Sequence, residues 1–148
     1  MSRRYFTVGE VDRLVPRLQQ IFVQVLQLRG AMRTEQDKLE RAGVALTPEA
    51  LEGSSASDSA EVRQGKLMFR AFYEELTTRL AEIQRLGGEV KDLETGLVDF
   101  PARRKDEEIL LCWKLGERNV EYWHAVDAGF RGRRRIDDEV PREPPALD

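Results

Sequence analysis

The sequence predicts an α-dominated α+β fold, in which a long antiparallel α-helical hairpin is followed by a small antiparallel β element. Two observations predict this class. Apolar residues recur at helical spacing over two long segments, and after Gly88 the spacing shifts toward the period of two that is typical of strands. The 148 residues, of which 41% are hydrophobic and 34% charged, suit one domain with helices exposed to solvent.

The first helix is expected over about residues 8–42. Thr7 and Glu10 have the spacing of a capping box, in which each side chain bonds the backbone amide of the other residue. Beyond this start, apolar residues recur every seven positions, as they do on a helix face that packs against a partner. The row consists of Val11, Leu18, Val25, Met32 and Leu39.

A loop is expected over residues 43–58, where the composition becomes small and polar. Within it, the segment 47–50 is able to form one short capped helical turn. A second helix is then expected over about 59–86, starting at Asp58 or Ser59 and ending at the Gly87-Gly88 pair. Because a loop joins two long helices, residues 1–88 most simply form an antiparallel hairpin.

The closing block, residues 89–135, is expected to be a small β-containing element packed on the hairpin. Residues 97–100 and 109–113 are strand candidates, joined by a hairpin loop of about seven residues after Pro101. Residues 89–92 form a third candidate strand, whereas 119–124 fit one helical turn or an extended segment equally well. The proline-rich tail, 136–148, is expected to be disordered.

Composition excludes several classes of function. The net charge is −3, and the basic run 131–135 is followed at once by three acidic residues, so no nucleic-acid partner is expected. No apolar run approaches the length of a membrane span or of a signal peptide, so we expect a soluble, cytoplasmic protein with no membrane partner. A single cysteine and a single histidine exclude an internal disulfide and a multi-histidine zinc site.

Short blocks at both ends of the chain resemble a widespread family of small bacterial proteins known only as a domain of unknown function. The blocks are Arg4-Tyr5-Phe6-Thr7 with Glu10, Gly96 to Ala102, Leu111-Cys112-Trp113, Gly116-Glu117, Tyr122-Trp123-His124, and Gly129-Phe130-Arg131-Gly132-Arg133. The resemblance covers roughly residues 4–135. It implies no activity, but it indicates that the closing block is the distinguishing surface of the family.

The closing block also holds the candidate site. Asp99, Glu117 and His124 combine carboxylates with the sole imidazole, a donor set that suits several divalent metals. The alternative is a structural His124 that packs on its neighbours. The residues expected to line a pocket around them are Arg103, Cys112, Trp113, Trp123 and Asp127. Nucleophilic catalysis by Cys112 with His124 is a further hypothesis, against which stands the apolar strand around the cysteine.

The function predicted first is a non-enzymatic interaction or scaffold module that self-associates, with a second copy or another protein as partner and with no cofactor. The helical stripe expected to mediate self-association consists of Leu18, Phe22, Val25, Phe69 and Leu76. The alternative is a protein that binds a metal or a small ligand, as a binding protein or as an enzyme, with its site around Asp99, Glu117, Trp123 and His124. A divalent metal is the cofactor of that alternative.

Overall fold

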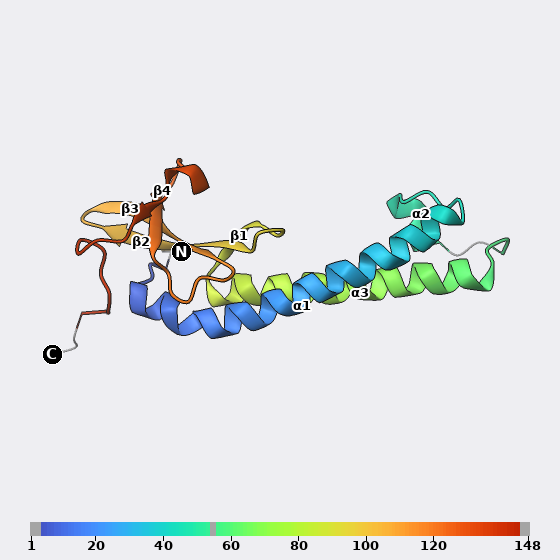
Figure 1. The fold of residues 1–148 in the computed structure, drawn as a ribbon, viewed down its shortest axis with the longest axis horizontal. Helices are drawn as coiled ribbons and strands as arrows, with labels where there is room; N and C mark the ends of the chain where they lie inside the picture. Colours follow the sequence, from blue (N-terminus) through green and yellow to red (C-terminus); the bar gives the residue numbers. More distant parts are fainter. Residues whose placement is uncertain (1–3, 54–55, 146–148) are drawn as a thin grey trace. The chain divides into compact units, whose positions relative to one another are not determined.

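The computed structural model describes residues 4–53 and 56–145 and confirms the α+β class, with helices followed by a five-stranded antiparallel sheet (Figure 1). The elements are α1 (Val8–Arg41), α2 (Pro48–Glu52), α3 (Ala60–Leu86), β1 (Glu89–Asp92), β2 (Leu97–Arg104), β3 (Glu107–Lys114), β4 (Tyr122–Ala125), the 3-10 helix η1 (Phe130–Gly132) and β5 (Arg134–Arg135). Among the described residues, no helix is long and apolar enough to cross a membrane.

The chain divides into two compact units. The helical unit is Val23–Ala81, and the sheet unit combines Met1–Phe22 with Glu82–Asp148. The bounds of α1 and α3 agree with the predicted helices to within a residue or two. The packing of these helices as a long antiparallel hairpin stays a prediction.

In the helical unit, polar side chains start α2 and α3. The Thr47 hydroxyl accepts the Ala50 amide at 3.1 Å, which confirms the short helical turn expected in the loop. The Ser59 hydroxyl accepts the Val62 amide at 3.1 Å and so caps α3. The side chain of Lys66 is almost buried because its ammonium bonds both the loop and the carboxylate of Asp58.

In the sheet unit, α1 begins with the predicted capping box. The Thr7 amide donates to Glu10 Oε1 at 2.9 Å, and the Glu10 amide donates to Thr7 Oγ1 at 3.3 Å. The backbone hydrogen bond from Thr7 lowers the pKa of Glu10. The first half of α1 then covers one face of the sheet, where Phe22 packs on Trp113 with ring centroids 6.1 Å apart.

The sheet is a meander in the order β1-β2-β3-β4-β5, with every neighbouring pair antiparallel. The predicted seven-residue loop is wrong, because β2 continues through Pro101 and pairs Arg104 with Glu107 across a two-residue turn. Proline is tolerated there because β1 pairs with β2 only as far as Asp99, so the nitrogen of Pro101 lies on an edge where no strand needs its N–H. Its carbonyl accepts the Phe6 amide on that edge at 2.7 Å.

The tail after residue 135 lies against the start of α1, in contrast to the predicted disorder. The carbonyls of Pro141 and Arg142 accept the amides of Val8 and Gly9, which are first-turn donors that no helix carbonyl can satisfy. Val140 is buried as well. Residues 146–148, the end of the predicted disordered segment, lie outside the described residues.

Candidate functional site

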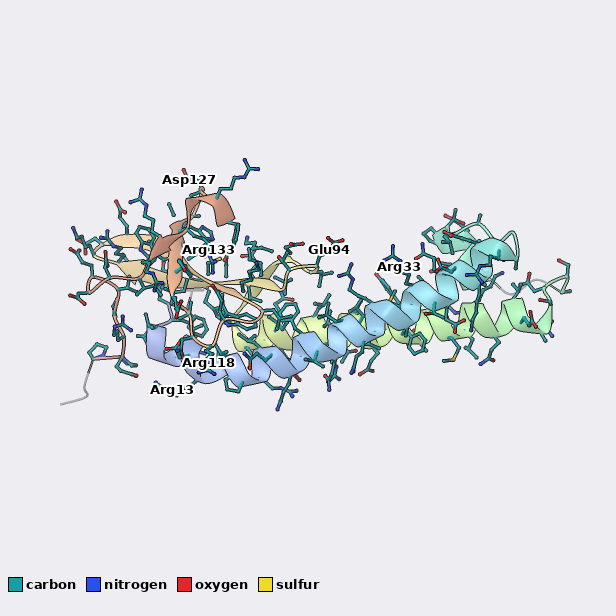
Figure 2. All side chains as sticks on the ribbon, viewed as in Figure 1. Arg13, Arg33, Glu94, Arg118, Asp127 and Arg133 are labelled. Atoms are coloured by element: carbon teal, nitrogen blue, oxygen red, sulfur yellow. The ribbon has the colours of Figure 1, made fainter. Side chains whose placement is uncertain are left out.

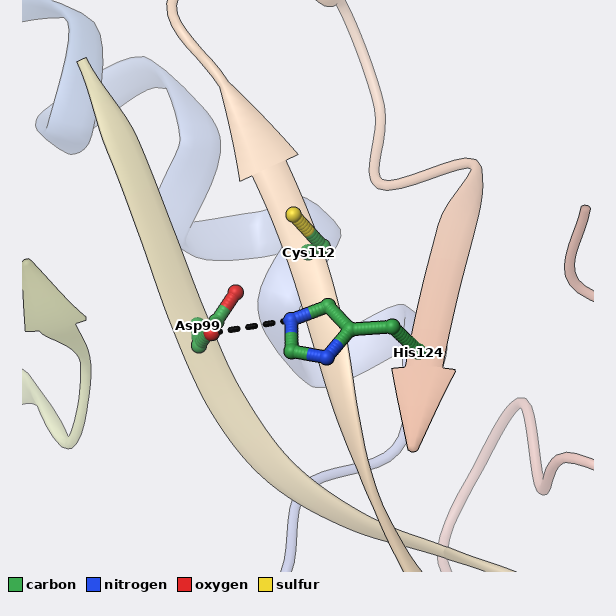
Figure 3. Close-up of side chains that lie close together, drawn as sticks. All are labelled: Asp99, Cys112 and His124. Carbon is green, nitrogen blue, oxygen red and sulfur yellow. Dashed lines mark hydrogen bonds and ion pairs between the residues drawn. The ribbon is translucent and has the colours of Figure 1, made fainter. Parts of the chain in front are cut away.

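Three neighbouring strands bring Asp99, Cys112 and His124 together on one face of the sheet (Figure 3). Asp99 on β2 lies directly opposite Cys112 on β3, and His124 on β4 lies diagonally to Cys112. Because strand side chains alternate, this is the face opposite to that of Trp113. All three residues are buried, and their potential ligand atoms lie within 4.8 Å of one another.

Hydrogen bonding fixes the protonation pattern of His124. Its Nδ1 lies 2.7 Å from the Ala125 carbonyl oxygen, which can only accept, so Nδ1 carries a proton. Its Nε2 lies 2.9 Å from Asp99 Oδ2, and that contact needs one shared proton. The pair is therefore either an imidazolium with a carboxylate or a neutral imidazole with a carboxylic acid. In both forms its net charge is zero, as burial requires.

The other oxygen of Asp99 is unsatisfied. Oδ1 is buried and has no hydrogen-bond partner among the described residues. A buried acceptor of this kind costs free energy, and an ion or ligand is one explanation for its presence. Beside it, burial and then the charge of Asp99 raise the pKa of the Cys112 thiol to about 12. The protein therefore holds Cys112 as a neutral thiol and not as a reactive thiolate.

A pocket of about 590 Å³ opens over this face of the sheet, and Asp99 and His124 form part of its lining. Most of the remaining lining is apolar or comes from the turn after β4. It consists of Lys91, Asp92, Thr95, Leu97, Leu110, Lys114, Val126, Asp127, Ala128, Gly129 and Phe130. Lys114 forms no ion pair within the described ranges, and its ammonium lies 5.9 Å from the centroid of the Phe130 ring.

Arg133, labelled in Figure 2, connects β3 to Phe130, whose ring lines the pocket. Its guanidinium donates to the Cys112 carbonyl at 3.0 Å and to Glu117 Oε1 at 2.7 Å. The same group stacks on the rings of Tyr122 and Phe130, at 4.1 and 4.9 Å from their centroids. The segment that carries Phe130 is thus tied to β3 and β4 by one largely buried cation.

The structure brings only part of the predicted site together. Asp99 and His124 pair, Cys112 joins them, and Asp127 lies on the pocket wall. Glu117 lies outside the cluster, because its carboxylate binds Arg133 and the Lys114 amide.

The other predicted pocket residues do not line the pocket. Arg103 is exposed, with its guanidinium 5.0 Å from the centroid of the Tyr5 ring. Trp113 and Trp123 belong to the opposite face of the sheet, since each is a strand neighbour of a cluster residue.

The predicted self-association stripe is largely buried within the chain. Leu18, Phe22 and Val25 have no exposed surface, Leu76 is 8% exposed and Phe69 is half-buried. Self-association stays a prediction, but these side chains do not offer a free apolar surface for it.

The sequence did not single out Leu110, Lys114 and Phe130 as pocket residues. A signal existed for two of them. Leu110 and Lys114 lie two residues either side of Cys112, so the period of a strand places all three on one face. Phe130 had no such signal, because its position depends on Arg133 and on the turn after β4.

Comparison with known families gives a match over residues 4–136 to the model described as Uncharacterized conserved protein (DUF2203). The match confirms the expected family of unknown function, while the role of each quoted block within it stays a prediction. No curated protein and no solved structure matches the chain.

Proposed function

Because the chain belongs to the family of uncharacterised conserved proteins DUF2203, we propose a function from the site itself: the protein binds a small organic molecule in the pocket over β2, β3 and β4. The observation that carries this proposal is the buried Asp99–His124 pair, which lines a pocket of ligand size. Apolar residues of similar volume are often as stabilising as such a buried pair, so stability alone does not explain it.

The pair is suited to binding more than to proton transfer. A general base needs a free nitrogen that can take a proton from the substrate. Both nitrogens of His124 are engaged, one by Ala125 and one by Asp99. The protonated thiol of Cys112 argues against nucleophilic catalysis in the same way. We therefore propose a binding protein and not an enzyme.

The lining suggests the chemistry of the ligand. Leu97, Leu110 and Phe130 offer contacts to an apolar or aromatic body, and Lys114 offers an ammonium with no ion pair among the described residues. An aromatic carboxylic acid matches both features, with its ring against the apolar wall and its carboxylate at Lys114.

The proposal is tested with a panel of aromatic carboxylic acids and their neutral primary amides, observed by saturation-transfer NMR. The chain has a single histidine, so the ¹⁵N signals of its ring report on the pocket without assignment. We expect several acids to bind and to shift these signals. We expect the matched amides to bind at least tenfold more weakly, because they lose the interaction with Lys114.

Two substitutions locate the binding. Ala128 is exposed and lines the pocket, so Ala128→Trp fills the pocket without disturbing the core. Ala71 is an exposed alanine of α3 outside the pocket lining, and Ala71→Trp is the matched control. The expected result is lost binding in the first variant and unchanged binding in the second. Binding of no acid, or equal binding to both variants, would overturn the proposal.

A further inference from the structure

We propose that Asp99, Cys112 and His124 bind a divalent metal ion of the zinc class at the inner end of the pocket. The inference rests on the proposed function in one respect only, namely that an open coordination position faces the bound molecule. The metal site itself rests on the three side chains and their geometry.

The donor set favours zinc. Thiolate, imidazole and carboxylate are the three ligand types that zinc takes in proteins, and alkaline-earth ions prefer oxygen alone. Three protein ligands leave the fourth tetrahedral position free, as in zinc sites that bind a further molecule. That position would be taken by water or by a carboxylate from the pocket.

The distances are close to those that a metal requires. Tetrahedral zinc with ligand bonds of about 2.0–2.3 Å places its ligand atoms about 3.3–3.6 Å apart. The three ligand atoms here lie within 4.8 Å of one another, and Asp99 Oδ2 lies 2.9 Å from His124 Nε2. Shifts of about 1 Å or less, within reach of side-chain rotation, would complete the site.

Two independent observations support a metal ion at this position. The first is the buried Oδ1 of Asp99, which lacks a hydrogen-bond partner in the described part of the chain. The second is the orientation of His124, whose Nδ1 proton is donated to the Ala125 carbonyl while Nε2 faces the other two ligands. Metal-binding histidines are typically oriented by such a carbonyl, which fixes the tautomer.

The charges balance with and without the metal. Without it, the thiol is neutral and the Asp99–His124 pair has no net charge. On binding, one proton leaves Cys112 and the proton shared by the pair leaves as well, both to solvent. A carboxylate, a thiolate and a neutral imidazole then surround a dication, so the buried site is again neutral.

The test uses the full-length protein, stripped with a chelator and titrated with cobalt(II) and then zinc(II). Cobalt bound to a thiolate gives a near-ultraviolet charge-transfer band, so the spectrum reports directly on Cys112. We expect one cobalt per chain with this band, displaced by one zinc. Zinc is also expected to shift the His124 Nε2 signal while Nδ1 keeps its proton.

Substitutions separate the ligands from their surroundings. Cys112→Ser and Asp99→Asn are expected to weaken zinc binding at least 100-fold and, for Cys112→Ser, to abolish the band. Asp106→Asn removes an exposed carboxylate of the turn between β2 and β3, outside the pocket lining, and is expected to bind zinc as the wild type does. The ¹⁵N signals of the histidine ring in each metal-free variant show whether its sheet is folded. If a variant does not fold, the cobalt and zinc titration of the wild-type protein tests the metal site by itself.

Absence of stoichiometric cobalt binding, or binding without the thiolate band, would overturn the inference. So would a zinc affinity unchanged in folded Cys112→Ser. The two proposals fail separately. If aromatic acids bind the chelator-treated protein but neither cobalt nor zinc does, the metal site alone is overturned. Stoichiometric metal with no acid bound would overturn the organic ligand alone.

Discussion

Removal of either partner of the Asp99–His124 pair is expected to destabilise the sheet unit strongly. The two side chains are 1% and 3% exposed, so solvent cannot replace a lost partner. In Asp99→Ala, His124 Nε2 loses its only partner among the described residues, which costs about 2 kcal/mol, and the small cavity adds about 1 kcal/mol. In His124→Ala the carboxylate loses its hydrogen-bond partner in the described part of the chain, and about 4 kcal/mol is expected.

The double variant separates the interaction from the cavities. It contains neither the carboxylate nor the ring, so neither member of the pair is left without the other, and its cost should be about 4 kcal/mol, well below the sum of the single costs. The coupling energy of the cycle is then about 3 kcal/mol. Asp99→Asn should cost only about 1 kcal/mol, because its amide can donate to Nε2 of the neutral ring.

The measurement is urea unfolding of the metal-free protein, followed by tryptophan fluorescence. Both tryptophans of the chain, Trp113 and Trp123, lie in the strands of the sheet unit, so the signal reports on the unit that holds the pair. A coupling energy below about 0.5 kcal/mol, with unchanged m-values, would refute the reasoning. It would mean that the two groups are satisfied without each other.

Three further outcomes are expected. Iodoacetamide should label Cys112 only after denaturation. The pKa of this thiol rises from 9.0 to about 12 on folding, so its contribution to stability is complete below pH 9 and is lost as the pH rises above that value. In urea unfolding, the stability advantage of wild type over Cys112→Ala should therefore fall by about 1 kcal/mol between pH 9 and 10. Arg104 lowers the pKa of Asp137 below its ordinary 3.8, so the ion pair stabilises the attached tail above pH 3.8, and this contribution is lost as the pH falls through the lowered pKa. Limited proteolysis at neutral pH should therefore cut the tail faster in Asp137→Asn than in wild type. The difference should vanish once wild-type Asp137 is protonated. Thr7→Ala removes the cap of α1 and should cost about 1 kcal/mol by thermal unfolding, whereas Thr7→Ser should cost little.

The helices could be predicted from the sequence because their signals are local. Thr7 and Glu10 lie within one turn of each other, and the glycines after Leu86 end the second long helix whatever surrounds it. The docked tail was not predictable in this way. Its partners are Val8 and Gly9, more than 130 positions away, and its composition is that of a disordered segment.

The cluster was only half predictable, and the reason is register. A loop over 102–108 would pair Pro101 with Ile109 and therefore Asp99 with Leu111. The two-residue turn shifts the pairing by one position, so that Asp99 faces Cys112. A shift of one residue exchanges the faces of a strand. Asp99 and His124 could be proposed from their chemistry alone, but their partner Cys112 depended on a turn whose key residue, Lys105, adopts a positive φ of 57°.

The polar cluster interrupts a strand whose other buried residues are apolar. Six successive residues of β2, from Leu97 to Ala102, are buried, and Asp99 is the only charged residue among them. Its hydrogen-bond partner on β4, His124, is the chain's only histidine and is also buried. Apolar residues of similar volume would often stabilise such a position as well or better. Folding stability alone therefore does not account for this pair, whereas a bound metal or ligand would use its polar atoms, the unsatisfied oxygen of Asp99 included.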